Sequence, residues 1–109
     1  MKIPEVYFFD MDNTLIDNDC DVSWKLFAVK HHLAPESDLV EAKRFFDDYN
    51  AGTLNAEEFY SFQFREFVGH TESEMLDLSW QHFDEFVKDH IYSEGVKLVK
   101  EVLNQGLPV

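Results

Sequence analysis

The chain opens with an unbroken apolar run and then changes to helical spacing. Residues 6–9 are Val-Tyr-Phe-Phe, with no polar break, which is typical of a strand buried on both faces, as in a parallel sheet. Residues 10–14 follow directly and read Asp-Met-Asp-Asn-Thr. Ligands bind at the carboxyl ends of the strands in parallel α/β sheets. We therefore expect a buried first strand with functional residues immediately after it.

Helical spacing begins near Asp21. A first helix is predicted from there until Pro35 closes the segment, and a second over Ser37 to Tyr49, with Gly52 as its terminator. The expected inner faces carry Val22, Leu26, Val29 and Leu33 in the first helix and Leu39, Ala42, Phe46 and Tyr49 in the second.

Two helix starts carry capping signals. Asn55 with Glu58, and Thr71 with Glu74, have the spacing of a capping box, which predicts a helix beginning directly after each cap. Helical patterns then continue to about His90. We expect these consecutive helices to form a bundle-like insert.

A last helix is predicted near the end of the sequence. Ser93 could cap it, and Gly106 occupies the position after its end. Its apolar stripe consists of Val96, Val99 and Leu103. Residues 107–109, Leu-Pro-Val, resemble the start of another strand, because a crossover helix normally leads to the next parallel strand. We therefore expect an incomplete sheet.

Composition narrows the classes of partner. With 109 residues, 45% of them hydrophobic and eleven of them Phe, the chain is expected to fold as one domain or as part of one. A formal net charge of −13 repels nucleic-acid backbones and anionic membranes. We read most of these acidic residues as a solvated surface and expect no nucleic-acid partner.

The sequence gives no sign of secretion or membrane insertion. Cys20 is the single cysteine, so an internal disulfide is impossible, and the first residues lack the apolar region of a signal peptide. No stretch approaches the roughly 20 apolar residues that cross a bilayer. We expect a cytoplasmic protein.

The acidic residues after the first strand suggest phosphoryl transfer. Asp10 is the candidate nucleophile, which would form an aspartyl-phosphate, and Asp12 could act as general acid and then general base. Their charges call for a hard cation such as Mg²⁺, with Asp10 contributing its side chain and Asp12 its main-chain carbonyl. Thr14 could bind the phosphoryl oxygens through its hydroxyl and N–H.

Simpler readings of these residues remain open. Asp10 and Asp12 could be turn formers after a strand. The spacing of Asp10, Asp12 and Thr14 also matches part of a calcium loop, but Leu15 stands where that loop needs Gly.

Aromatic and histidine residues are expected to be structural. Trp24 is predicted to pack in the core, and the five histidines show no ligand spacing and are expected at the surface. Core packing is the first interpretation of an aromatic group, although the helices could line an apolar pocket with it. This group consists of Phe59, Phe62, Phe64 and Phe67.

The segment Phe8-Phe9-Asp10-Met11-Asp12-Asn13-Thr14-Leu15 resembles motif I of the haloacid dehalogenase (HAD) superfamily, a hydrophobic strand followed by DxDxT. The helical insert resembles the cap of the phosphoserine-phosphatase-like branch (subfamily IB). In that branch a Gly-x-Leu-Asn stretch precedes a cap helix, and residues 52–55 repeat it; residues 93–95, Ser-Glu-Gly, resemble the return to the core. The resemblance extends over nearly the whole chain.

The resemblance implies an α/β fold, mostly helical by content: a Rossmann-like core, here only its first strand and return helix, with a helical C1-type cap. The domains would be 1–17 (strand and catalytic loop), 18–91 (cap) and 92–109 (return helix and start of the second strand). Asp19 matches a substrate-contacting cap carboxylate, although it could simply cap a helix. Gln63 stands where the branch has a substrate-binding Arg, which disfavours phosphoserine.

The resemblance also implies catalytic groups that would lie beyond Val109, so we expect these 109 residues to be an incomplete and inactive portion. The complete protein would be a Mg²⁺-dependent phosphatase acting on a small phosphorylated metabolite. The alternatives are a noncatalytic module that accepts a phosphoryl group on Asp10, or one that oligomerises, since an unfinished sheet exposes an edge. A homo-oligomer is therefore a possible assembly.

Overall fold

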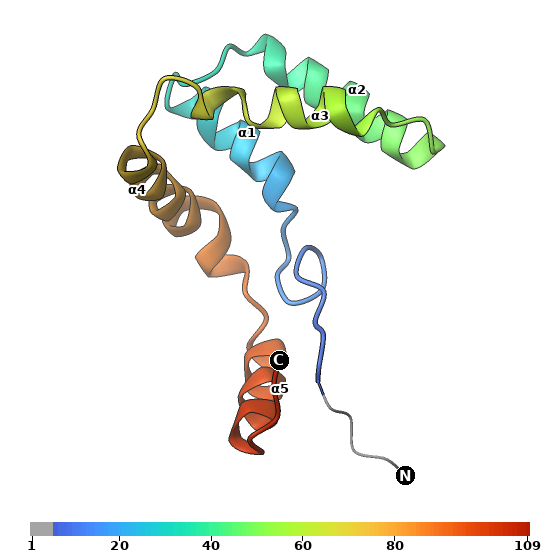
Figure 1. Cartoon of the computed structure of the whole chain (residues 1–109), viewed down its shortest axis with the longest axis vertical. Coiled ribbons are helices and arrows are strands. Elements are labelled where there is room, and N and C mark those ends of the chain that lie inside the picture. The colour runs from blue at the N-terminus through green and yellow to red at the C-terminus, as the bar shows by residue number, and fades with distance from the viewer. Residues whose placement is uncertain (1–5) are drawn as a thin grey trace.

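The computed structural model describes residues 6–109, and this part of the chain is mostly helical (Figure 1). The α-helices are α1 (Cys20–Lys30), α2 (Ser37–Ala51), α3 (Ala56–Gln63), α4 (Glu72–His82) and α5 (Ser93–Asn104). A 3₁₀ turn, Arg65–Phe67, follows α3, and a π-helical turn, Phe83–Val87, and a 3₁₀ turn, Lys88–His90, follow α4. None of the described helices combines the length and apolar character needed to cross a bilayer.

Local capping sets the ends of the helices. The Asn55 side chain accepts a hydrogen bond from Glu58 N–H at 3.0 Å, and Thr71 accepts one from Glu74 N–H at 3.1 Å. Gly52 ends α2 in the left-handed conformation, with φ 74°, which costs glycine little. These predicted starts and this predicted end are confirmed.

The cap predicted for the last helix is wrong. Ser93 is the first residue of α5, and the preceding Tyr92 occupies the cap position without a side-chain hydrogen bond. The N–H of Tyr92 instead donates to the Leu15 carbonyl at 3.0 Å. Pairing with the loop before α1 thus holds the start of α5.

Helix α1 lies at the centre of the helical segment, with α2 and α3 extending to one side and α4 on the other (Figure 1). Trp24 and Phe27 of α1 pack with Met75 of α4 in the hydrophobic core, and Phe27 is fully buried. The predicted packing role of Trp24 is confirmed.

The predicted inner stripe of the first helix is wrong at Val22 and Leu26, whereas Val29 is half-buried and Leu33 packs against the core. Val22 and Leu26 are each 42% exposed. The buried residues of α1 are Ser23, Trp24, Lys25, Phe27 and Ala28. A helix with neighbours on two sides buries a wider and differently placed surface than one apolar stripe, and here that surface includes polar residues.

A buried charged group, which we call the Lys25 network, joins α1 to α2 and to the turn after α3. Lys25 Nζ lies 2.6 Å from Glu66 Oε1 and 3.4 Å from Asp38 Oδ2, and it donates to the Phe62 carbonyl at 2.8 Å. Arg65 donates to the other Asp38 oxygen at 3.0 Å. Lys25 is 1% exposed, so all three of its donors are used inside the protein.

The predicted buried first strand is not formed. Residues 6–10 are extended, but Phe8 is 89% exposed, and no strand occurs between residues 6 and 109. One backbone hydrogen bond, from Tyr7 N–H to the Pro108 carbonyl at 2.9 Å, joins this segment to the residues after α5. An apolar segment becomes a buried strand only when other strands and helices cover it, and the described residues supply no such cover. The Rossmann-like core is therefore not seen here.

The two connections of the helical segment to the rest of the chain lie side by side. Asp17 N–H donates to the His90 carbonyl at 2.8 Å, next to the bond from Tyr92 to Leu15, and Ile16 and Ile91 form an antiparallel bridge. We call this pairing the base of the insert. The predicted domain limits lie close to it and stay a prediction.

Candidate functional site

A tight loop after residue 10 shapes one end of the candidate site. The N–H groups of Thr14, Leu15 and Ile16 all point to the Met11 carbonyl, at 3.2, 3.0 and 3.2 Å. Asn13 has a positive φ of 55°, a conformation that Asn tolerates better than most residues. The chain therefore turns sharply here, and Asp10, Asp12 and Asn13 face one cavity.

Asp10 and Thr14 are directly linked. The Thr14 hydroxyl donates to Asp10 Oδ2 at 2.6 Å, a short and strong bond because the acceptor is charged. It fixes the orientation of the Asp10 carboxylate. Thr14 is therefore beside the candidate nucleophile, although it does not line the cavity itself.

Asp12 carries a buried oxygen without a partner. Its Oδ1 has no hydrogen bond within residues 6–109, and a buried carboxylate oxygen normally has one. A bound cation or a hydrogen-bond donor of a ligand would satisfy it. No three acidic, histidine or cysteine side chains of the described residues come together as a metal site. Two carboxylates still fit Mg²⁺, which usually keeps several waters and takes further oxygens from a phosphate.

Asp19 caps α1 and also lines the cavity. Its Oδ1 accepts hydrogen bonds from the N–H groups of Asp21 and Val22, at 3.0 and 3.2 Å. The helix-cap reading is therefore confirmed. A role in substrate binding stays a prediction.

Negative charge accumulates around the start of α1. Burial, followed by the charges of Asp19 and Asp12, raises the pKa of Asp21. Burial also raises the pKa of the Cys20 thiol to about 11, helped by the nearby carboxylates of Asp12, Asp19 and Asp21. Both shifts indicate a site in which added negative charge is unfavourable.

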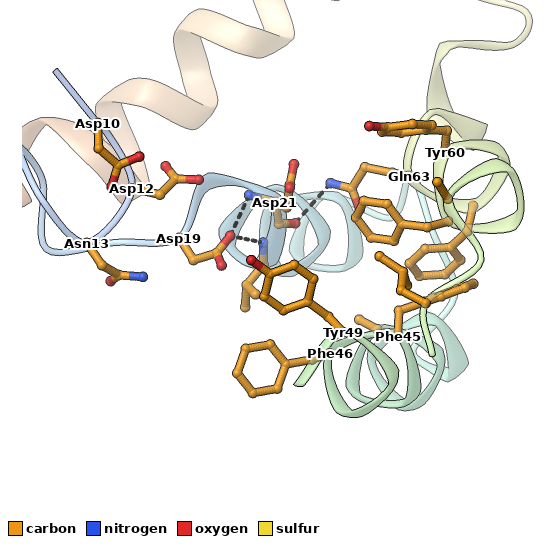
Figure 2. A pocket seen from close by; sticks show the side chains of 16 residues that line it. Asp10, Asp12, Asn13, Asp19, Asp21, Phe45, Phe46, Tyr49, Tyr60 and Gln63 are labelled. Atoms are coloured by element: carbon orange, nitrogen blue, oxygen red, sulfur yellow. Dashed lines mark hydrogen bonds between the residues drawn. The ribbon is translucent and has the colours of Figure 1, made fainter. Parts of the chain in front are cut away.

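The cavity has a volume of about 550 Å³ and is enclosed by the loop, α1, α2 and α3. Figure 2 shows Asp10, Asp12 and Asn13 at one end and Tyr49, Tyr60 and Phe45 at the other, with Asp19 and Asp21 between them. Its aromatic wall consists of Phe45, Phe46, Tyr49, Phe59, Tyr60 and Phe62. The cavity thus joins an acidic end to a broad apolar surface.

Part of this aromatic wall was predicted from the sequence. Phe59 and Phe62 line the cavity, whereas Phe64 and Phe67 lie outside it and pack edge to face on each other, with ring centroids 5.3 Å apart. Asp21, Tyr49 and Tyr60 were not expected in the site. A stripe of polar and aromatic residues on helices that face the loop with Asp10 and Asp12 is the signal that could have found them.

One expected surface histidine is buried. His82 is 9% exposed, and its Nε2 lies 2.8 Å from the Ser23 hydroxyl, which also accepts a hydrogen bond from Asn18 at 2.8 Å. Burial lowers the pKa of His82. This contact joins α4 to α1, and the bond from Asn18 links both to the loop before α1.

Comparison with known proteins adds a link to phosphatases. No protein-family model matches the chain. Over 84 residues, 76% of this chain, it is 27% identical to a protein named histidinol-phosphatase from Neisseria meningitidis serogroup C (strain 8013). The chain is similar to a phosphatase. It spans 38% of that relative's length.

A solved structure shares the fold. The crystal structure of a protein with unknown function from Bordetella pertussis Tohama I superimposes with a TM-score of 0.71 at 24% sequence identity, over 89% of this chain and 44% of that one. The helical arrangement described here therefore recurs in a chain more than twice the matched length. At this identity, the likeness concerns the fold alone.

Proposed function

We propose that the protein containing these residues is a phosphomonoesterase of the HAD type, in which the segment 18–91 acts as a helical cap. The observation that carries this is the position of Asp10 and Asp12 together at the acidic end of the cavity, after a DxDxT sequence. Similarity to a relative named histidinol-phosphatase supports it. A Rossmann-like core and a cytoplasmic location belong to the same proposal.

The reaction would proceed in two displacements. A carboxylate oxygen of Asp10 attacks phosphorus, the bond to the ester oxygen breaks, and Asp12 protonates the leaving alcohol. Water then attacks the phosphorus of the aspartyl-phosphate while Asp12 accepts its proton, which releases inorganic phosphate and restores Asp10. The Thr14 hydroxyl, 2.6 Å from Asp10 Oδ2, supports this role by holding the nucleophile in place.

Asp10 and Asp12 would hold Mg²⁺, which lowers the repulsion between the carboxylates and the phosphoryl group. Asp10 would contribute its side chain and Asp12 its main-chain carbonyl, so that the partnerless Asp12 Oδ1 stays available for the proton transfers. The named relative makes histidinol phosphate the first compound to assay.

The test is phosphate release from histidinol phosphate and p-nitrophenyl phosphate with Mg²⁺, using the natural protein that contains these 109 residues. Asp10→Asn should abolish turnover, and Asp12→Asn should lower kcat by about 10²–10⁴-fold. Asp17→Asn is the matched control, because Asp17 is an exposed acid of the same loop that does not line the cavity.

Trapping of the intermediate tests the nucleophile directly. Borohydride reduces an acyl phosphate, so it should convert residue 10 to homoserine only during turnover, as read by mass spectrometry. Turnover by Asp10→Asn equal to wild type would show that the mechanism is wrong. A stable phosphoryl group on Asp10 without phosphate release would favour the noncatalytic acceptor.

A further inference from the structure

We propose that the cavity selects phosphomonoesters whose alcohol part carries a positively charged N–H donor on a flat apolar body. This inference rests on the proposed phosphatase function and adds the substrate class. The phosphoryl group would lie at Asp10 and Asp12. The charged donor would lie at Asp21 and Gln63, farther along the same cavity (Figure 2).

Gln63 offers a hydrogen-bond acceptor to the cavity. Its side chain lines the cavity, and the residue is only 5% exposed. Its Nε2 donates to the Asp21 carbonyl at 3.0 Å. Since a carbonyl can only accept, this bond fixes which way the amide faces. Gln63 Oε1 is left without a hydrogen bond in the described chain, so a ligand that donates there gains a contact with the protein.

The neighbouring carboxylates also favour a positively charged donor. Asp19 and Asp21 line the cavity, and neither forms an ion pair within residues 6–109. Among the described residues, no Lys, Arg or His lines the cavity. Burial and the charges of Asp19 and Asp12 raise the pKa of Asp21, and a cation beside it would oppose this effect. A carboxylate-bearing ligand would instead meet only repulsion in this part of the site.

The aromatic wall completes the fit. Phe46, Tyr49 and Tyr60 are 51%, 68% and 55% exposed and line the cavity opposite the acidic end. Aromatic faces attract cations and pack well against flat rings. The volume of about 550 Å³ is within the range of pockets that enclose small organic ligands.

Binding of three hydrolysis-resistant benzylphosphonates tests the inference without requiring turnover. They carry aminomethyl, ethyl or carboxymethyl at the para position; the first two match in size and differ in charge, and the third brings a negative charge on a somewhat larger group. Calorimetry with the natural protein and Mg²⁺ should give the lowest Kd for the aminomethyl compound, about tenfold below the ethyl compound, with the carboxymethyl compound weakest. Hydrolysis of the matching benzyl phosphates should follow the same order in kcat/KM.

Two variants test which residues cause the preference for the aminomethyl compound. Asp21→Asn and Gln63→Met should each reduce the ratio of Kd values between the ethyl and aminomethyl compounds, whereas Asp77→Asn, an exposed acid of α4 outside the cavity, should leave it unchanged. Equal or tighter binding of the ethyl compound, or no binding of any compound, would overturn the inference. Selective binding without hydrolysis would overturn the proposed function and keep the binding site.

Discussion

Replacing Lys25 with Met should destabilise the protein strongly. Met keeps most of the volume but removes the ammonium group, which lies 2.6 Å from Glu66 Oε1 and donates to the Phe62 carbonyl. Glu66 would keep only the 3.4 Å hydrogen bond from Trp24, although its side chain is 2% exposed. Leaving a buried charge without its partner costs about 3–5 kcal/mol, a large share of the roughly 5–15 kcal/mol that stabilises a domain.

The assay is urea unfolding followed by tryptophan fluorescence, because Trp24 lies in the core. Lys43→Met is the control, since its i,i+4 pair with Asp47 is exposed and should contribute at most about 0.5 kcal/mol. The double variant Lys25→Met/Glu66→Gln should lose less than the sum of the single variants, because it removes the stranded charge. A loss below about 1 kcal/mol for Lys25→Met would refute the reasoning, since it would match a surface pair.

Three further predictions concern His82, Asp19 and Cys20. Burial lowers the pKa of His82. Neutral His82 therefore contributes its full stabilisation above the ordinary pKa of about 6.5, and this stabilisation is lost as pH falls below that value. His82→Gln should flatten the decrease in unfolding free energy measured between pH 7.5 and 5.5. Asp19→Ala should lose about 1 kcal/mol of cap stability while Asp19→Asn loses little, so equal loss of ligand binding in both variants would identify a role for the charge. Cys20, with a pKa of about 11, should react with iodoacetamide at pH 8 roughly a hundredfold more slowly than an ordinary thiol. The reaction should become faster when Mg²⁺ neutralises the charge of Asp12. A rate insensitive to Mg²⁺ would contradict metal binding at Asp12.

The helix boundaries could be predicted because their signals are local. Asn55, Thr71 and Gly52 act on residues within four positions of themselves, and the structure places them as expected. The buried strand failed for the opposite reason. Whether Phe8 is covered depends on other strands and helices, which no local pattern contains.

The interior of the helical segment was harder to read. Lys25 looks like a surface residue, yet its partners Asp38 and Glu66 come from 13 and 41 positions away. Only the packing of α1 against α2 makes this arrangement possible. The same holds for the cavity: the motif predicted Asp10 and Asp12, but Tyr60 joins them only because α3 runs back alongside α2 toward α1.

The base of the insert gives the helical segment a single anchoring point. The backbone segments that enter and leave the helical segment are hydrogen-bonded to each other, through Asp17 with His90 and Leu15 with Tyr92. Because the two ends already meet, changes in length between them cost little in chain entropy and need not disturb the loop that holds Asp10. The segment from α1 to α4 can therefore be exchanged as one unit, which would place different helices over the same loop that holds Asp10.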